Sequence, residues 1–341
     1  MYWYNFLMKE KLSLSTFFLS LILSNFIIAE NYKIAFGSCL DQEDPQPIWN
    51  SVFKEDIDSF IFLGDNVYGD VPSGELNKMH EAYKLQAEMI PSWLFKKNVE
   101  VIWDDHDFGE NDGGASYPLK QEAQKLYLDF WKIPIDDVRH KREGIYTNQI
   151  INIDNFKINL ILLDTRYFRS DLKRTEGIKP VYLKNEELNA TILGGEQWSW
   201  FKEVMKIKSD LIIIATSIQL LPTEHRFEKW SNFPSDHLKL KSLLKSQSRP
   251  VLVISGDRHQ GAIYNDENIY EITSSSLNKT ISSIFGRPKE VDRYMLGEMF
   301  SGENYGLITI NTNKKIIDLE IKDINGNRVR HKTIDIKKGY N

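Results

Sequence analysis

Four short polar stretches of the sequence each follow a run of apolar residues, and they carry the side chains best suited to chemistry. The stretches are Gly37–Cys39, Gly64–Asp70, Asp104–Asp107 and Gly256–His259. Carboxylates gathered with a thiol, a phenol and imidazoles at one place repel one another unless cations lie among them. We therefore interpret the stretches as ligands of bound metal ions. The alternative is that each Asp is a separate helix cap or turn former.

The side-chain types indicate which kinds of ion would bind. Tyr68 follows Asp65 by three residues, so one loop turn can aim both at a single ion. Carboxylate, phenolate and thiolate suit a strongly Lewis-acidic or trivalent ion, whereas further carboxylates suit a hard divalent ion. Cys39 is the one cysteine of the chain. It is either a small buried hydrophobe or a ligand whose metal would protect it from oxidation, and we favour the ligand.

The apolar runs predict the scaffold that positions these residues. Runs without polar alternation predict strands covered on both faces at Ile34–Phe36, Ser59–Leu63, Val99–Trp103, Asn159–Leu163, Leu211–Ala215 and Val251–Ser255. Helical spacing of apolar residues predicts helices at Gly74–Ile90, Leu119–Trp131 and Glu196–Ile207. Further strands are predicted at Gly306–Ile310 and Ile316–Ile321. The fold class is therefore α/β, with one large mixed sheet or two packed sheets, and a site at the carboxyl ends of its strands.

Composition excludes several classes of protein. The chain has 341 residues, of which 41% are hydrophobic and 27% charged, as in ordinary globular proteins and unlike disordered, collagen-like or coiled-coil chains. A single cysteine rules out an intrachain disulfide. The net charge of -5 and the lack of a basic stripe argue against a nucleic-acid partner.

The first 29 residues resemble a secretory signal peptide. Lys9 and Lys11 precede the apolar run Leu12–Ala29, which ends in a small residue just before Glu30. No twin-arginine pair is present, which favours the Sec route to the periplasm or the exterior. We therefore expect a signal peptide over residues 1–29, one domain over 30–341, and no stable membrane span in the mature chain. The alternative is an uncleaved membrane anchor.

Taken in order, five motifs resemble a known family. They are GSC at Gly37–Cys39, GDNVYGD at Gly64–Asp70, WDDHD at Trp103–Asp107, LDTR at Leu163–Arg166 and GDRH at Gly256–His259. Their order is similar to that of the alkaline phosphatase D (PhoD-like) branch of the calcineurin-like metallophosphoesterases. The resemblance covers about Tyr32 to Asn313. It implies a four-layer sandwich, in which two packed mixed β-sheets are flanked by helices, and a small phosphoester substrate.

The resemblance also implies a multinuclear metal centre. The first ion, ferric iron, would be held by Cys39, Asp65, Tyr68 and either Asp257 or His259. Asp65 would bridge to a second site that calcium fills, with Asp105 and Asn111 as its further ligands. Mn, Zn and Mg are the alternative divalent occupants. The wider superfamily also places a His near Ile214, and the nearest candidates in this chain are His225 and, closer to the strand end, Gln219.

Two residues are candidates for catalysis. Arg166 follows a predicted strand and could bind phosphate oxygens bidentately, the alternative being an ion pair with Asp164 or on the surface. His106 would donate a proton to the leaving oxygen or, as the alternative, orient a ligand. The predicted activity is hydrolysis of phosphate mono- or diesters by metal-activated hydroxide. The other readings are a metal-dependent hydrolase of another bond and a non-catalytic metal-binding module.

The aromatic loops are expected to surround this site. Trp230, Phe233 and the stretch Ser276–Phe300 are predicted to form its rim or a lid, the alternative being that they pack in the core.

Overall fold

The structure is a computed structural model that describes residues 31–177, 181–281 and 290–336. The predicted signal peptide over residues 1–29 lies outside the described residues. The chain divides into two units, Met1–Asn31 and Tyr32–Asn341, and the fold described below is that of the second. Within the described ranges, no helix has both the length and the apolar character that crossing a membrane requires.

The first sheet carries the earliest strands of the chain and its last three. In order across the sheet they are β14 (Arg328–Asp335), β13 (Ile316–Asp323), β12 (Asn304–Asn311), β1 (Tyr32–Gly37), β2 (Ser59–Leu63) and β3 (Asn98–Ile102). Strands β1, β2 and β3 run parallel, and β12 pairs with β1 in the antiparallel sense. The carboxyl ends of β1, β2 and β3 therefore lie along one edge.

The second sheet also has six strands. In order they are β10 (Gly261–Asp266), β11 (Ile269–Ser274), β9 (Val251–Ser255), β8 (Leu211–Thr216), β5 (Phe156–Leu162) and β4 (Thr147–Ile153). The four central strands run parallel, and both outer strands are antiparallel to their neighbours. A small hairpin of β6 (Lys173–Arg174) and β7 (Tyr182–Leu183) stands apart from both sheets.

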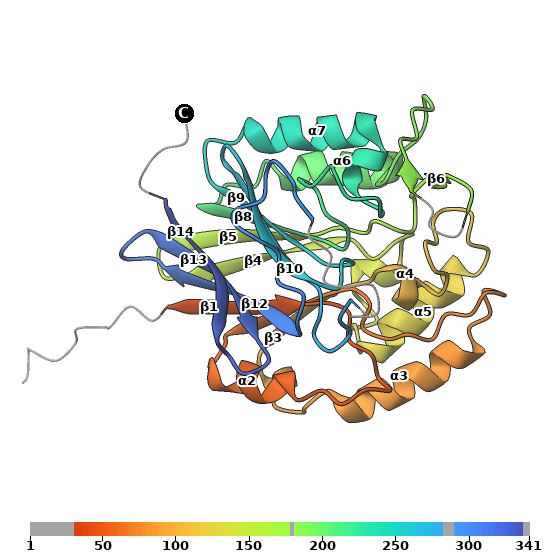
Figure 1. The fold of residues 1–341 in the computed structure, drawn as a ribbon, viewed down its shortest axis with the longest axis horizontal. Coiled ribbons are helices and arrows are strands. Elements are labelled where there is room, and N and C mark those ends of the chain that lie inside the picture. Colours follow the sequence, from red (N-terminus) through yellow and green to blue (C-terminus); the bar gives the residue numbers. More distant parts are fainter. Residues whose placement is uncertain (1–30, 178–180, 282–289, 337–341) are drawn as a thin grey trace, which may run out of the picture. The chain divides into compact units, whose positions relative to one another are not determined.

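Three apolar clusters arrange these elements in four layers (Figure 1). Side chains such as Phe36, Leu160 and Ile254 form the cluster between the two sheets. Helices α2 (Ile48–Lys54), α3 (Asn77–Met89) and α5 (Lys120–Phe130) cover the outer face of the first sheet. Helices α6 (Gly194–Val204) and α7 (Pro234–Lys245) cover the second. Burial of both sheet faces explains why central strands such as β2, β8 and β9 are mainly apolar.

The predicted α/β fold with two packed mixed sheets is confirmed. The prediction that Trp230 and Phe233 belong to a rim is wrong, because both side chains are buried in the cluster beneath α6 and α7. The indole of Trp230 donates a hydrogen bond to Thr216 Oγ1 at 3.0 Å. Of the stretch Ser276–Phe300, Ile281 lines the cavity described below, and residues 282–289 lie outside the described part.

Candidate metal centre and active site

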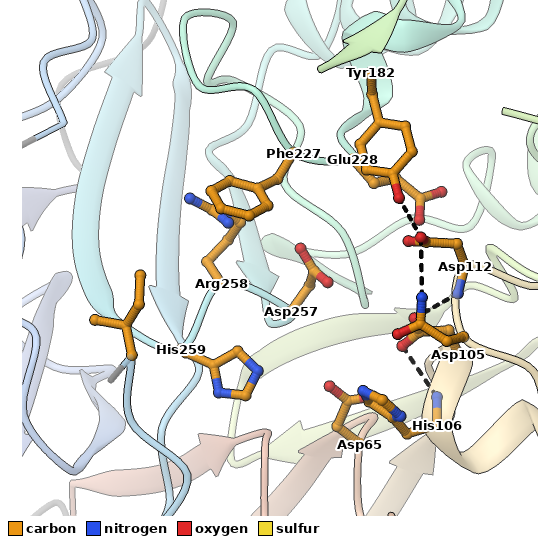
Figure 2. A pocket seen from close by; sticks show the side chains of 12 residues that line it. Asp65, Asp105, His106, Asp112, Tyr182, Phe227, Glu228, Asp257, Arg258 and His259 are labelled. Carbon is orange, nitrogen blue, oxygen red and sulfur yellow. Dashed lines mark hydrogen bonds between the residues drawn. The ribbon is translucent and has the colours of Figure 1, made fainter. Parts of the chain in front are cut away.

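The polar stretches meet where the strands of both sheets end. Cys39 follows β1, Asp65 follows β2, and the short helix α4 (Asp105–Phe108) follows β3. From the second sheet, His259 comes from the loop between β9 and β10. These loops surround a cavity of about 280 Å³. Figure 2 shows Asp65, Asp105 and His106 on one side of it and Asp257 and His259 on the other.

Two groups of candidate metal ligands share Asp65. The ligand atoms of Cys39, Asp65 and His259 lie within 4.8 Å of one another, and so do those of Asp65, Asp105 and His106. Asp65 is buried, and its Oδ1 has no hydrogen-bond partner. A buried carboxylate oxygen without a partner is costly in a protein unless a cation compensates it. The arrangement therefore fits a bridging role for Asp65 between two ions.

The thiol of Cys39 is fully buried beside Asp65. Its Sγ lies 3.4 Å from Asp65 Oδ2 and 3.4 Å from the hydroxyl of Ser275. Burial, together with the neighbouring carboxylate, raises the pKa of Cys39 well above its usual value. In the metal-free site the thiol is therefore protonated, and binding an ion would release its proton.

Tyr68 adjoins the same group of candidate ligands. Its hydroxyl donates to Asp65 Oδ2 at 3.3 Å. The ring packs against His106, with centroids 4.3 Å apart, and the ammonium of Lys279 lies 3.8 Å from the ring centroid. Burial and the charge of Asp65 raise the pKa of Tyr68 well above its usual value. Tyr68 thus stands where its phenol oxygen and Asp65 Oδ2 can face one ion.

His259 is held in the orientation that a metal ligand needs. Its Nδ1 donates to the backbone carbonyl of Lys279 at 2.7 Å, which leaves the Nε2 lone pair as the ligand. Burial lowers the pKa of His259 to about 4, so the ring is neutral. Asp257 lines the same cavity but belongs to neither ligand group, and burial raises its pKa to about 7. Of the two alternatives for the first ion, the geometry favours His259.

His106 sits between carboxylates. Its Nδ1 donates to Asp70 Oδ1 at 2.6 Å. Burial opposes a charge on the ring, but the charges of Asp105, Asp65 and Asp70 outweigh it and raise the pKa of His106 to about 11 in the metal-free site. The ring is therefore protonated at neutral pH when no ion is bound.

The second candidate site is built around Asp105. Its Oδ2 accepts a hydrogen bond from the backbone N–H of Asp112 at 2.8 Å. Asn111 lines the cavity, and its amide nitrogen donates to Asp112 Oδ2 at 3.0 Å, so the amide oxygen is the atom it would offer to an ion. The hydroxyl of Tyr182 also donates to Asp112. Asp112 therefore ties the hairpin that carries Tyr182 to the candidate ligands.

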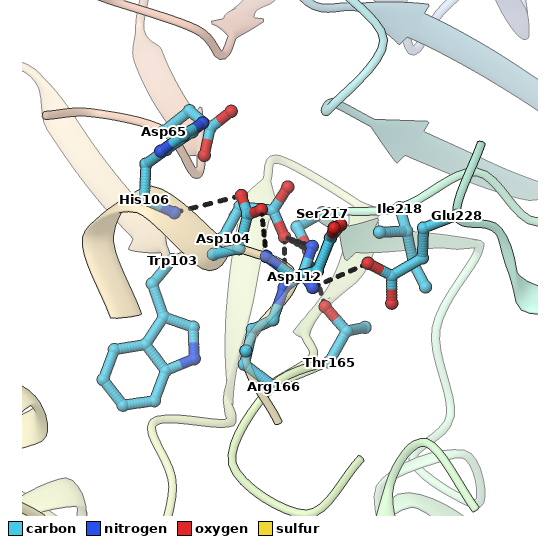
Figure 3. A network of polar contacts seen from close by, with 12 residues as sticks. Asp65, Trp103, Asp104, His106, Asp112, Thr165, Arg166, Ser217, Ile218 and Glu228 are labelled. Atoms are coloured by element: carbon cyan, nitrogen blue, oxygen red, sulfur yellow. Dashed lines mark hydrogen bonds and ion pairs between the residues drawn. The ribbon is translucent and has the colours of Figure 1, made fainter. Parts of the chain in front are cut away.

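Arg166 lies behind the cavity in a buried charge network (Figure 3). The side chain is fully buried, with Nε 2.6 Å from Asp104 Oδ1 and Nη1 2.7 Å from Glu228 Oε2. Asp164, the partner considered from the sequence, instead accepts the backbone N–H of Arg166 at 2.9 Å. The guanidinium does not line the cavity. A direct contact with phosphate would require at least one of these buried pairs to break.

The backbone is strained at the same residues. Among the described residues ten non-glycine positions have a positive φ, and five of them are Cys39, Asp65, Asp112, Asp257 and His259, with φ between 51° and 67°. This region is unfavourable for most side chains, and such conformations cluster at functional sites. Gly64, with φ 97°, permits a tight approach, since a Cβ there would lie 2.5 Å from the backbone nitrogen of Asp104.

Two further candidates lie outside the ligand groups. Gln219 is buried and donates to Tyr264 and Thr273, which makes it part of a polar network inside the second sheet. His225 is in neither ligand group.

The residues that sequence reasoning missed are Asp70, Tyr182, Glu228 and Arg258. Asp70 and Arg258 stand inside quoted motifs, so their positions were a signal, but nothing in the sequence singles out Tyr182 or Glu228.

Comparison with known proteins identifies the family. The model of the PhoD-like phosphatase family matches residues 96–285, more than half of the chain, which therefore belongs to this family. The chain is 23% identical over 291 residues to alkaline phosphatase D of Bacillus subtilis (strain 168). The alignment covers 71% of this chain and 48% of that protein, so the chain spans about half the length of this curated relative.

Solved structures agree on the fold. The chain is similar to the structure of PhoD, with a TM-score of 0.65 and 15% identity over 91% of this chain and 70% of that one. It is also similar to GAP50, the anchor in the inner membrane complex of Plasmodium, with a TM-score of 0.62 and 14% identity over 91% and 90% of the two chains. At these identities the likeness shows the fold alone.

Proposed function

We propose that this protein is a metal-dependent phosphoesterase that hydrolyses phosphate mono- or diesters, as its family membership suggests. The observation that carries the proposal is Asp65, which belongs to both ligand groups at the base of the cavity. A shared carboxylate is what two adjacent ions need in order to act on one phosphoryl group.

The donor set supports two different ions. Thiol, phenol, imidazole and carboxylate from Cys39, Tyr68, His259 and Asp65 suit ferric iron, and the oxygen ligands of Asp65, Asp105 and Asn111 suit calcium or another hard divalent ion. When bound, such a centre supplies Lewis acidity toward the phosphoryl oxygens and activates a water molecule for attack on phosphorus.

The proposal gives two of the chain's own residues separate roles, one in proton transfer and one in positioning. His106 lines the cavity and is held by Asp70 through Nδ1, so its Nε2 is the nitrogen that gives a proton to the leaving oxygen. Arg166 has a positioning role in this proposal. It compensates the buried charges of Asp104 and Glu228 and thereby fixes the loop that carries Asp105 and His106.

We also propose that the protein acts outside the cytoplasm, which rests on the signal-like residues 1–29. N-terminal sequencing of the protein from the periplasm or the medium should then begin near Glu30. Recovery of a membrane-bound chain that retains Leu12–Ala29 would support the anchor instead.

The activity is tested with purified protein and two chromogenic substrates, 4-nitrophenyl phosphate and bis(4-nitrophenyl) phosphate. We expect nitrophenol release from at least one of them, loss of release after exhaustive chelation, and recovery on adding back iron and calcium. 4-Nitrophenyl sulfate and 4-nitrophenyl acetate serve as controls for hydrolases of other esters. Protein that contains metal and hydrolyses neither phosphate ester would favour a metal-binding module.

A further inference from the structure

A short segment of the chain, residues 275–279, contacts the candidate ligands of the first ion. It directly follows β11. The backbone N–H groups of Asn278 and Lys279 donate to the carbonyl of Cys39 at 3.3 and 3.2 Å. The carbonyl of Lys279 accepts the hydrogen bond from His259 Nδ1 at 2.7 Å. One residue of this segment therefore joins two candidate ligands that follow strands of different sheets.

The side chain of Lys279 reaches a third candidate ligand. Its ammonium lies 3.8 Å from the ring centroid of Tyr68 and is paired with the carboxylate of Asp41. The hydroxyl of the same ring donates to Asp65, and the ring packs against His106. A cation held against an aromatic ring is attracted by the electrons of its face and favours one position of the ring. The orientation of Tyr68 therefore depends on Lys279 as well as on its two other neighbours.

The ion pair of Lys279 is anchored at its carboxylate end. The backbone N–H of Asp41 donates to Asn278 Oδ1 at 2.7 Å, and Asn278 Nδ2 donates to the carbonyl of Asp41 at 2.8 Å. Asp41 and Asn278 are both buried, whereas the side chain of Lys279 is 37% exposed. The carboxylate thus has a fixed base from which it holds the ammonium over Tyr68. Because Asp41 also compensates the charge, Lys279 acts on the ring rather than on an anion of the substrate.

We propose that Lys279 is a positioning residue of the first metal site, whose ammonium holds the ring of Tyr68 toward the ion and whose carbonyl holds His259. The inference rests on the metal centre of the proposed function. Groups that orient metal ligands contribute to metal affinity without touching the metal, and their replacement weakens binding about 10- to 100-fold. A substitution at Lys279 keeps the backbone contacts with Cys39 and His259, so it isolates the effect of the ammonium on Tyr68.

The test compares Lys279→Met, which removes the charge and keeps an unbranched side chain, with Lys279→Arg, which keeps the charge. Each full-length protein is loaded with ferric iron alone, and its visible absorption band and its iron affinity, by competition with a chelator, are measured. We expect Lys279→Met to weaken iron binding about 10-fold. Its band should move to longer wavelength, because the electrons of a phenolate that has lost a nearby cation are held less tightly. Lys279→Arg should restore both properties toward wild type.

Lys241 supplies the matched control. Its ammonium lies 4.5 Å from the ring centroid of Tyr294 and pairs with Asp266 at 2.7 Å, which is the same kind of contact on helix α7. None of these three residues lines the cavity or belongs to a ligand group. Lys241→Met should therefore keep the wild-type band and iron affinity. In a Tyr68→Phe protein, Lys279→Met should cause no further shift, because the phenolate is already gone.

The outcomes separate this inference from the proposed activity. Lys279→Met with the wild-type band overturns the positioning role, even if iron binding is weaker, because loss of mere structural support does not shift the band. Wild type that takes up no ferric iron, or takes it up without colour, also overturns the role, while nitrophenol release from a phosphate ester still supports the phosphoesterase. A coloured protein that shows the predicted shift and hydrolyses no phosphate ester keeps the positioning role and counts against the activity.

Discussion

Asp70 Oδ1 accepts a hydrogen bond of 2.6 Å from Nδ1 of His106. The pair joins the last residue of the GDNVYGD motif to the histidine of WDDHD, and the two residues are 36 positions apart in the chain. It fixes the tautomer and the orientation of a ring that lines the cavity.

We expect Asp70→Asn to lower kcat about 10-fold, as is typical when a group that orients a catalytic residue is replaced. Loss of the carboxylate also lowers the pKa of His106, so the proton donor is lost at lower pH and the alkaline limb of the kcat profile moves to lower pH. Steady-state kinetics from pH 6 to 11 measure both effects, with His106→Asn as the variant that lacks the donor. An unchanged kcat and alkaline limb in Asp70→Asn would show that Asp70 does not act through His106.

The same histidine makes the stability of the metal-free protein depend on pH. Burial opposes its charge, but the surrounding carboxylates raise its pKa to about 11, whereas the unfolded chain has a pKa of ~6.5. The folded state therefore holds a proton that the unfolded state has lost, and this stabilisation is complete below pH ~6.5 and disappears as the pH rises toward 11.

Urea unfolding of the chelated protein at pH 7, 8.5 and 10 (values chosen as about the span of this window) measures the effect. The free energy of unfolding should fall with pH more steeply in wild type than in His106→Asn. Parallel curves for the two proteins would contradict the raised pKa.

Arg166 provides a test of stability. Arg166→Ala removes the ion pairs that Arg166 makes with the buried carboxylates of Asp104 and Glu228, which should cost about 3–5 kcal/mol of unfolding free energy. Arg328→Ala, which removes an exposed pair with Glu320, should cost about 0–1 kcal/mol. A large increase in KM for Arg166→Ala without loss of stability would instead support the direct phosphate contact that the sequence indicated.

The sequence predicts the scaffold well where burial is complete. The strands β2, β8 and β9 are buried at every residue, and each is an apolar run apart from one serine or threonine at one end. Strand β14 was missed because it lies at the edge of a sheet, where most of its side chains are at least partly exposed and polar. The motifs could also be expected to meet, because each follows a strand and the carboxyl ends of parallel strands lie along one edge of a sheet.

Contacts between distant loops could not be predicted in the same way. Glu228 pairs with Arg166 across 62 residues, and no local pattern marks either residue as the partner of the other. Trp230 and Phe233 were misread because aromatic residues in a loop look the same whether they line a rim or fill a core. In the structure, helices α6 and α7 pack over this loop, so both side chains are buried in the core.

The nature of the first ion can be tested by its colour. Phenolate or thiolate bound to ferric iron gives a charge-transfer band, so iron-loaded protein should absorb visible light. Tyr68→Phe removes only a hydroxyl and should abolish or shift the band while the fold is kept. Cys39→Ser should weaken iron binding because serine is less readily deprotonated. A colourless, fully active enzyme that contains only divalent ions would exclude ferric iron and leave the phosphoesterase proposal intact.

The measurement that tests the central proposal most directly is metal content together with phosphoesterase turnover in wild type and Asp65→Asn. Asp65 is the one residue common to both ligand groups among the described residues. If it bridges two ions, the neutral amide cannot replace it, and the variant should lose metal and lower turnover by several orders of magnitude while circular dichroism shows the native fold. A folded Asp65→Asn protein with wild-type metal content and turnover would contradict the shared-carboxylate centre.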